Sequence, residues 1–341
     1  MINIGIVGLG FMAAAHLRAY RQVDGVRIAA LCNPSGRHLD GDFTKVAGNV
    51  GATDAVKLDM TGIRATKNVA DLLADPEVHV IDICAPTKAH AELAVAALRA
   101  GKHVLCEKPL ARTSGAAREI MSAASGARGF FMPAMCIRFW PEWTWLRQAI
   151  AENRFGRVLA ARFRRVAEPP GWGKNTFFNG ADSGGGLFDL HIHDTDFVQF
   201  CFGRPQSVNS TGYVKFSGAI DHVVTQYEVA SGAMVHAEGG WAMTPGFGFN
   251  MSYTVNFERA TADYDSSRGQ EALRLCEAGQ PARVITCEGG DGYVGELRHF
   301  VECIRAGKPS TVVTAEDGLS SVEICEAEER SIRERQSVRL S

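Results

Sequence analysis

The sequence lacks a long apolar run, a marked excess of charge and a closely spaced cysteine pair. No apolar stretch approaches the ~18 residues that a membrane helix requires, so no membrane association is expected. Lys and Arg number 36 against 38 Asp and Glu, and the net charge of -2 leaves no basic field for nucleic acid. The nearest cysteines, Cys276 and Cys287, are too far apart for a CxxC zinc or redox motif.

The first residues also lack the basic start and the cleavage site of a signal peptide, and they are typical of a β-strand instead. We therefore expect a cytoplasmic protein with reduced cysteines. What the sequence does contain is an ordinary globular composition, with 46% hydrophobic and 22% charged residues over 341 positions. At about 150 residues per domain, this length predicts two domains.

Residues 1–130 alternate short apolar runs with helical patterns. The runs are almost continuously apolar, which is typical of strands buried on both faces of a parallel sheet. Strand and helix in regular alternation predict a doubly wound α/β sheet of the Rossmann type. The predicted strands span 4–7, 26–32, 78–84 and 103–106, and the predicted helices span 12–23, 90–99 and 114–125.

Residues 131–341 show a different pattern, with strands separated by Gly, Pro and Ser. They predict an α+β domain with a mostly antiparallel sheet, which would bind substrate and form the oligomer. The predicted strands span 157–166, 206–216, 221–230 and 232–241, and the predicted helices span 142–153, 293–306 and 315–334. One face of this sheet should be partly apolar and pair with a second copy, so we expect a homodimer or homotetramer. The residues assigned to that face are Val224, Tyr227, Val229, Met234 and Val235.

A glycine-rich segment follows the first predicted strand. Gly8, Gly10 and Ala13 form a Gly-x-Gly-x-x-Ala pattern that encloses Phe11 and Met12. The first glycine permits a tight turn, the second lets the backbone approach a pyrophosphate, and the small alanine lets the helix pack closely. The position of this segment between a strand and a helix favours a dinucleotide site over a simple turn.

The acidic residue that usually binds the ribose 2′-hydroxyl at the end of the second strand is missing. Asn33 stands there, followed by Ser35 and Arg37. An acid would repel a 2′-phosphate, whereas these three side chains can donate hydrogen bonds to one. The sequence thus predicts an NAD(P) cofactor with a slight preference for NADP. The alternative is that Arg37 is a solvated surface charge and that Asn33 serves NAD.

Two further patterns carry candidate chemistry. Lys108 ends a predicted strand directly before Pro109, and ligands of doubly wound sheets bind at the carboxyl ends of strands. The Lys-Pro bond is a candidate for the cis form, which would fix the direction of the lysine. In the second half, a glycine triplet precedes a helical pattern that starts near Leu187 and places Asp189 and His193 on one face.

A carboxylate beside an imidazole orients the ring and stabilises its protonated form, which is the arrangement of a general acid–base pair. The alternative is that Asp189 and His193 only cap a helix. A metal site built on His191 and His193 is disfavoured, because positions two apart on a helix face nearly opposite ways. We expect no metal.

Together these segments resemble the Gfo/Idh/MocA family of glucose–fructose oxidoreductases and inositol dehydrogenases. The resemblance rests on the glycine loop, on Pro86-Thr87-x-x-His90, on Glu107-Lys108-Pro109 and on the Gly184 to Asp194 segment, and it spans nearly the whole chain. It implies that His193 takes the hydroxyl proton, that Asp189 holds or relays it and that Lys108 supports the alkoxide. It also implies cofactor contacts from Phe11, Met12, Pro86, Thr87, His90, Glu107, Lys108 and Arg138.

The implied substrate is a sugar, a sugar derivative or a cyclitol, interconverted between secondary alcohol and ketone with NAD(P). We expect substrate contacts from Lys108, Arg138, Trp172, Asp189, His191 and His193. The chain has Cys136 where relatives often have Asn, so that contact is not carried over. Two alternatives stay open: an NAD-dependent glycoside hydrolase of the same family, and a non-catalytic protein that senses sugar or dinucleotide.

Overall fold

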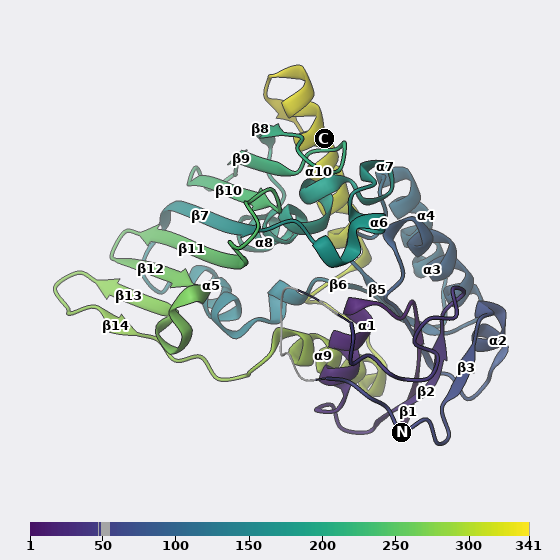
Figure 1. Ribbon diagram of the computed structural model, residues 1–341. Coiled ribbons are helices and arrows are strands. Elements are labelled where there is room, and N and C mark those ends of the chain that lie inside the picture. The colour runs from purple at the N-terminus through teal and green to yellow at the C-terminus, as the bar shows by residue number, and fades with distance from the viewer. Residues whose placement is uncertain (47, 49–54, 341) are drawn as a thin grey trace. The chain divides into compact units, whose positions relative to one another are not determined.

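The computed structural model describes residues 1–46, 48 and 55–340, without the side chains of residues 172, 174 and 175, and divides the chain into two compact units (Figure 1). Unit 1 comprises Met1–Cys136 and Gly290–Leu319, and unit 2 comprises Ile137–Gly289 and Ser320–Ser341. The sequence predicted one boundary at residue 130 and a continuous second domain. The structure differs because residues 290–319 return to unit 1.

Unit 1 is a Rossmann-type sheet in which every strand pairs in parallel with its neighbours. The order β3-β2-β1-β4-β5-β6 reverses between β1 and β4, which is where such sheets bind ligands. The strands are β1 (Ile2–Val7), β2 (Val26–Cys32), β3 (Arg64–Thr66), β4 (Val80–Ile83), β5 (His103–Glu107) and β6 (Phe131–Ala134). The predicted doubly wound fold is confirmed, and the short β3 and β6 are strands that the sequence analysis missed.

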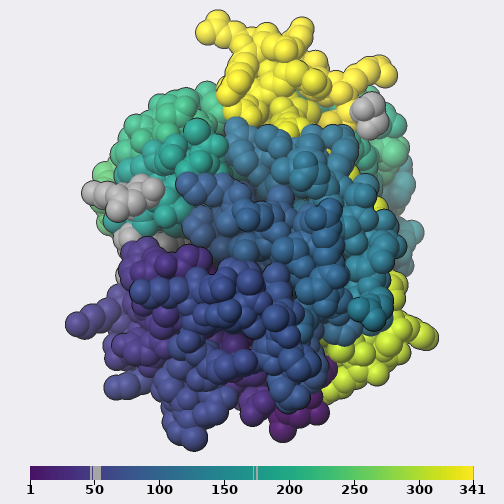
Figure 2. Space-filling model, turned by 90° about the vertical axis from the view of Figure 1, so that its right-hand side faces the viewer, coloured from purple at the N-terminus to yellow at the C-terminus, as the bar shows by residue number. Residues whose placement is uncertain are grey.

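Helices cover both faces of this sheet. In Figure 1, α3 and α4 lie on one side of it and α1 and α9 on the other. Figure 2 views the molecule from the α3 and α4 side, where their blue atoms form a continuous outer layer. The helices of unit 1 are α1 (Phe11–Tyr20), α2 (Val69–Ala74), η1 (Thr87–Ala89), α3 (His90–Arg99), α4 (Ser114–Ser125) and α9 (Gly292–Ala306).

Helix α9 belongs to unit 1 because of its contacts with the first helix and the turn after it. The ring of Tyr293 lies 6.2 Å from the ring of His16, and the guanidinium groups of Arg298 and Arg305 donate to the carbonyls of Gln22 and Asp24. The amphipathic pattern of α9 predicts the helix itself. That pattern carries no information on which sheet the helix covers, since any apolar surface satisfies it.

Unit 2 contains a nine-stranded sheet of order β14-β13-β12-β11-β7-β10-β9-β8-β15. Only the β10–β7 pair is parallel, so the predicted mostly antiparallel sheet is confirmed. The strands are β7 (Val158–Ala167), β8 (Ser207–Tyr213), β9 (His222–Glu228), β10 (Met234–Gly240), β11 (Phe249–Phe257), β12 (Ala260–Asp265), β13 (Leu273–Glu277), β14 (Arg283–Val284) and β15 (Val338–Arg339). Strands β11 to β15 were not predicted.

The core of unit 2 lies between this sheet and the helices on one of its faces. Trp143 of α5 packs its ring against Phe197 of α8 and Tyr253 of β11 at 4.8 and 5.2 Å between centroids. The helical elements of this unit are η2 (Cys136–Phe139), α5 (Pro141–Ala151), η3 (Gly171–Gly173), α6 (Lys174–Phe177), α7 (Gly180–Ser183), η4 (Leu187–His191), α8 (Ile192–Phe202) and η5 (Ser266–Glu271). Helix α10 (Ala315–Glu334) begins in unit 1 and ends in unit 2.

The prediction for the apolar sheet face was wrong for three of its residues. Tyr227, Val229 and Val235 are buried, and only Val224 and Met234 are exposed. The reason is the period of two along a strand, which sends Val224 and Tyr227 to opposite faces. All nine cysteines are free, and no described helix is long and apolar enough to cross a membrane.

Candidate functional site

The glycine loop of unit 1 has the geometry of a phosphate-binding turn. Gly8 follows β1 with a φ of +87°, and a Cβ there would lie 2.5 Å from the backbone of Ala85. Any other residue at position 8 would therefore be strained and would clash. The amide of Gly8 donates to the carbonyl of Cys32 at 2.9 Å, which ties the loop to the end of β2.

Gly10 stands immediately before α1, and its surroundings fit a bound pyrophosphate. Among the described residues, a Cβ on Gly10 would meet nothing within 4 Å, so they leave space at the start of the helix. The N-cap residue Gly10 offers no side-chain cap, and no acidic residue lies in the first turn of the helix. The helix dipole there favours an anion. Ala13 is fully buried, as the close packing of α1 on the sheet requires, while Phe11 and Met12 are half-buried beside the opening.

The loop after β2 folds on its own polar side chains. The Oδ1 of Asn33 accepts from the amide and the hydroxyl of Ser35 at 3.2 and 3.0 Å, and its amide group donates to the carbonyl of Arg37. The Nε of Arg37 lies 3.4 Å from the Ser35 hydroxyl. The three residues predicted to distinguish NADP from NAD are therefore brought together in one exposed turn.

Lys108 sits at the carboxyl end of β5, in a segment held by buried side chains. Its amide donates to the Oε2 of Glu107 at 3.0 Å, and the Lys108–Pro109 peptide is cis, as the sequence suggested. The carbonyl of Pro109 lies 2.8 Å from the Nδ1 of His90, whose Nε2 lies 2.8 Å from the carbonyl of Ala85. Burial lowers the pKa of His90, and a neutral ring carries one N–H, so it donates to one of these carbonyls at a time.

Two predicted cofactor residues are thus directed inward. His90 and Glu107 are buried and bind the Lys108 segment, which favours a structural position for both over the predicted cofactor contact. Pro86 is exposed and Thr87 is half-buried, and they stand where η1 and α3 begin.

Glu107 also faces a buried histidine that the sequence analysis did not single out. The Nε2 of His16 lies 3.1 Å from the Oε1 of Glu107, and its Nδ1 lies 2.9 Å from the Oδ2 of Asp82. His16 and Asp82 are fully buried. The sequence does indicate this buried cluster, since Asp82 is the one charged residue in the otherwise apolar strand β4 and His16 lies among small apolar residues of α1.

In unit 2, Asp189 and His193 lie on a helical segment that starts as a π-helix. Asp189 is in η4 and His193 is in the first turn of α8. The sequence predicted a regular α-helix from Leu187, whereas the structure begins this segment with a π turn. Such turns widen the backbone ladder and are frequent at functional sites. Asp189 is half-buried and His193 is 9% exposed, so each is placed at the edge of the core.

An aromatic row leads to Asp189. The indole Nε1 of Trp241 donates to the Oδ2 of Asp189 at 3.1 Å. Trp241 stacks on Phe178 at 5.9 Å, and Phe178 stacks on Phe216 at 5.7 Å. The Nζ of Lys215 lies 5.0 Å from the centre of the last ring. The row therefore ends in an N–H that fixes one oxygen of the Asp189 carboxylate. Trp241 was not predicted as a site residue, because it is distant from Asp189 along the chain.

His191 is directed into the core of unit 2. It is fully buried, and its Nε2 lies 3.2 Å from the hydroxyl of Tyr227 and 3.4 Å from Glu328. A Cβ on Gly239 of β10 would lie 2.5 Å from its Nδ1, so the ring requires a glycine there. This position favours an anchoring role for His191 over the predicted substrate contact.

Arg138 is also occupied within unit 2. Its Nε and Nη2 donate to the two oxygens of Asp196 at 2.8 and 2.7 Å, and both side chains are almost completely buried. The neighbouring Asp194 binds Arg165 in the same way at 2.9 Å. The bidentate pair favours a structural position for Arg138 over the predicted contacts with cofactor and substrate.

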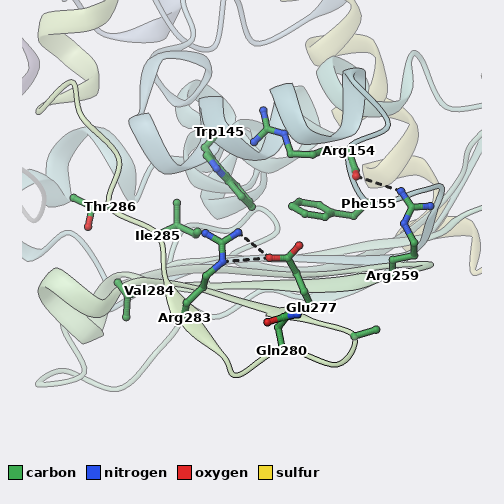
Figure 3. Close-up of a pocket in the computed structure, with 11 residues that line it drawn as sticks. Trp145, Arg154, Phe155, Arg259, Glu277, Gln280, Arg283, Val284, Ile285 and Thr286 are labelled. Carbon is green, nitrogen blue, oxygen red and sulfur yellow. Dashed lines mark hydrogen bonds and ion pairs between the residues drawn. The ribbon is translucent and has the colours of Figure 1, made fainter.

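An open cavity of unit 2 lies away from these residues. It has a volume of about 850 Å³ and lies on strands β13 and β14 (Figure 3). In the sheet, three strands, β12, β11 and β7, stand between these two and β10. Its wall carries Trp145, Phe155 and the paired Arg283 and Glu277, and none of the predicted site residues. The side chain of Trp172, a predicted substrate contact, lies outside what the structure describes.

Comparison with known proteins agrees with the predicted resemblance. Residues 2–134 match "Oxidoreductase family, NAD-binding Rossmann fold" of the GFO_IDH_MocA models, and residues 143–263 match "GFO/IDH/MocA C-terminal domain". The chain is 28% identical over 216 residues to levoglucosan dehydrogenase from Pseudarthrobacter phenanthrenivorans, covering 61% of this chain and only 53% of that protein.

Two other similarities extend over nearly the full length. Myo-inositol 2-dehydrogenase from Thermotoga maritima is 24% identical over 353 residues, with 99% of this chain and 98% of that protein covered. A solved structure of levoglucosan dehydrogenase, in complex with NADH and levoglucosan, superposes with a TM-score of 0.85 at 22% identity, covering 99% of both chains. This last similarity supports the fold.

Proposed function

The chain belongs to the Gfo/Idh/MocA family of NAD(P)-binding oxidoreductases, and on this basis we propose that it interconverts a secondary alcohol and a ketone on a sugar, a sugar derivative or a cyclitol. The observation that carries the proposal is the Asp189–His193 segment, where a π turn precedes the histidine and an indole N–H holds the carboxylate. The names of the relatives, levoglucosan dehydrogenase and myo-inositol 2-dehydrogenase, support the substrate class.

The proposed roles follow from the chemistry of the side chains. A bound nicotinamide supplies the hydride acceptor for oxidation and the hydride donor for reduction. His193 takes the proton of the substrate hydroxyl during oxidation and returns it during reduction. Asp189, held by Trp241, stabilises the protonated imidazole. The ammonium group of Lys108 stabilises the charge that develops on the substrate oxygen.

The experiment is a screen of the purified chain against sugars and cyclitols with NAD⁺ and NADP⁺, following the absorbance of the reduced nicotinamide. We expect cofactor reduction with at least one polyol and its loss in His193→Ala. Turnover of a glycoside without net cofactor reduction would favour the hydrolase of the same family. Sugar binding without any turnover would favour the sensor, and both alternatives lack support in the names of the relatives reported above.

We propose further that the cofactor is NADP in preference to NAD. The residue directly after β2 is Asn33 and not an acid, and Asn33, Ser35 and Arg37 form one exposed turn with donors for a phosphate. A carboxylate at position 33 would instead repel a 2′-phosphate. Dissociation constants for both cofactors, measured by quenching of protein fluorescence, test this preference directly.

For the assembly we propose a homodimer or homotetramer, with a location in the cytoplasm. Pairing of β8, β9 and β10 places Tyr213, Val224 and Met234 on one sheet face, where they are 47%, 40% and 66% exposed. Large exposed apolar side chains of this kind favour contact with a second copy. The nine free cysteines support a reducing compartment. Light scattering that returns a monomeric mass at micromolar concentration would refute the oligomer.

A further inference from the structure

His16 is a fully buried histidine between two carboxylates from different strands. Its Nδ1 lies 2.9 and 3.1 Å from the two oxygens of Asp82, on β4, and its Nε2 lies 3.1 Å from Glu107, at the end of β5. Asp82 is fully buried and Glu107 is 5% exposed. A neutral imidazole carries a single N–H and can donate to only one of these carboxylates.

The surroundings favour the cationic ring. Burial by itself lowers the pKa of His16, but the charge of Asp82 and the contacts with Asp82 and Cys84 raise it well above its usual value. The remaining groups that face the ring are Tyr20 of α1 and Tyr293 of α9, and the pKa of each phenol is raised by burial. An imidazolium hydrogen-bonds Asp82 through its Nδ1 and forms an ion pair with Glu107 at its Nε2, so its charge compensates both buried carboxylates.

Glu107 connects this buried ring to the active lysine. Its Oε1 faces His16, while its Oε2 accepts the backbone N–H of Lys108 at 3.0 Å. The two oxygens of one carboxylate therefore have different partners, and the orientation of the group is determined by both. Without the ring, the carboxylate loses the partner that holds its far oxygen and can rotate away from the amide.

We propose that His16 is a positioning residue that fixes Lys108 through Glu107. The proposal rests on the proposed function, in which Lys108 stabilises the substrate oxygen. Helix α1 then contributes twice, because it begins at the glycine loop and also carries the His16 ring, which orients Glu107 at the end of β5.

A metal site is the competing explanation. His16, Asp82 and Cys84 offer ligand atoms that all lie within 4.8 Å of one another. A sulfur ligand must be a thiolate. Burial and the charge of Asp82 instead raise the pKa of the Cys84 thiol far above its ordinary value, which opposes a thiolate. Stoichiometric zinc or iron in the purified protein by mass spectrometry would overturn the positioning role.

The test compares two neutral substitutions that retain different donors. The amide of His16→Gln can reach the Nε2 position and keep a polar contact with Glu107, whereas that of His16→Asn reaches the Nδ1 position and keeps the hydrogen bond to Asp82. Both variants lose the buried charge, so their stabilities should fall together. We expect kcat to fall about 10- to 100-fold in His16→Asn and no more than about threefold in His16→Gln, with unchanged cofactor affinity.

Equal kcat losses in the two variants would show a merely structural effect and overturn the proposal. A double-mutant cycle adds Glu107→Gln, which removes the charged acceptor. We expect the double variant His16→Asn/Glu107→Gln to be no slower than the slower single variant, since the two substitutions interrupt one connection. Multiplicative losses would show independent actions and contradict the connection.

A second measurement does not depend on activity. Selective ¹⁵N-lysine labelling, with Lys108→Arg identifying the signal, reports the amide of Lys108 directly. We expect its proton resonance to move upfield in His16→Asn and to stay in place in His16→Gln, because only the first variant releases the Glu107 acceptor. Unchanged shifts in both would overturn the proposal. Full kcat in Lys108→Met would instead refute the role of Lys108 in the proposed function and leave the amide measurement to decide on His16.

Discussion

The two units hold their candidate reactive side chains by different means. In unit 1, Lys108 is held through its backbone. Its amide donates to Glu107, which faces the buried His16, and His90 contacts the carbonyl of Pro109. In unit 2, Asp189 is held directly by an indole N–H, and the segment is anchored by His191. Lys108 is thus positioned through its main chain, whereas Asp189 is positioned through an oxygen of its carboxylate.

The anchors also differ in their polarity. The unit 1 anchor is the histidine His16 between two carboxylates, and the strength of this anchor depends on protonation of the imidazole ring. The unit 2 anchor joins His191, the Tyr227 hydroxyl and Glu328, with the hydroxyl donating to Glu328 at 2.7 Å. Substitutions in the two units should therefore differ in how much they lower activity or stability and in whether the loss depends on pH.

The largest effect is expected for His193, the proposed general acid–base residue of unit 2. His193→Ala should lower kcat by roughly 10²–10⁴-fold and leave cofactor affinity almost unchanged, because the phosphate loop belongs to unit 1. Steady-state kinetics and cofactor titration measure the two quantities. His236→Ala, an exposed histidine of β10, is the matched control and should keep the activity of the wild type. A fully active His193→Ala would return Asp189 and His193 to a structural role.

The charge of the unit 1 anchor should appear in stability. The folded state raises the pKa of His16 above the value of about 6.5 for an unfolded chain, so its stabilisation is complete below that pH. It is lost as the pH rises through the folded pKa. Urea denaturation should therefore show a stability gap between wild type and His16→Gln of about 1–3 kcal/mol at about pH 6 that narrows at higher pH. A gap that grows with pH would contradict the cationic ring.

A smaller effect is expected where unit 2 uses a neutral donor. Trp241→Phe keeps the stacked row but removes the N–H that binds Asp189, which should lower kcat about 10-fold with little change in KM. The control is Trp145→Phe, which alters the wall of the distant cavity of Figure 3 and should leave kcat intact. If both variants behave alike, the indole of Trp241 does not orient the carboxylate.

The smallest effect is expected at the exposed turn of unit 1. Arg37→Ala should raise the dissociation constant for NADP about 3- to 10-fold and leave that for NAD unchanged, because solvent screens a surface charge. Equal changes for both cofactors would show that Arg37 does not contact a 2′-phosphate. Asn33→Asp should weaken NADP binding in the same assay by adding a negative charge to the turn.

Much of this architecture was predictable because the signals are local. Continuous apolar runs identified β2 and β5, and the Gly8–Ala13 pattern identified the turn between β1 and α1. The spacing of Asp189 and His193 predicted that both lie on one helix, and the structure places them in the consecutive helical elements η4 and α8. Strands β11 and β12 were missed although they alternate, because their polar face carries Asn, Ser, Thr and Asp and weakens the apolar pattern.

By itself, the sequence determined the Rossmann unit, the mostly antiparallel second unit and the segments that carry the candidate chemistry, since periodicity and glycine placement act within a few residues. Only the tertiary structure decided which polar residues face each other. It paired Arg138 with Asp196, turned His191 toward Tyr227 and enclosed His16 between Asp82 and Glu107. These partners are separated by 36 to 91 positions along the chain, and only the packing of strands and helices brings them within hydrogen-bonding distance.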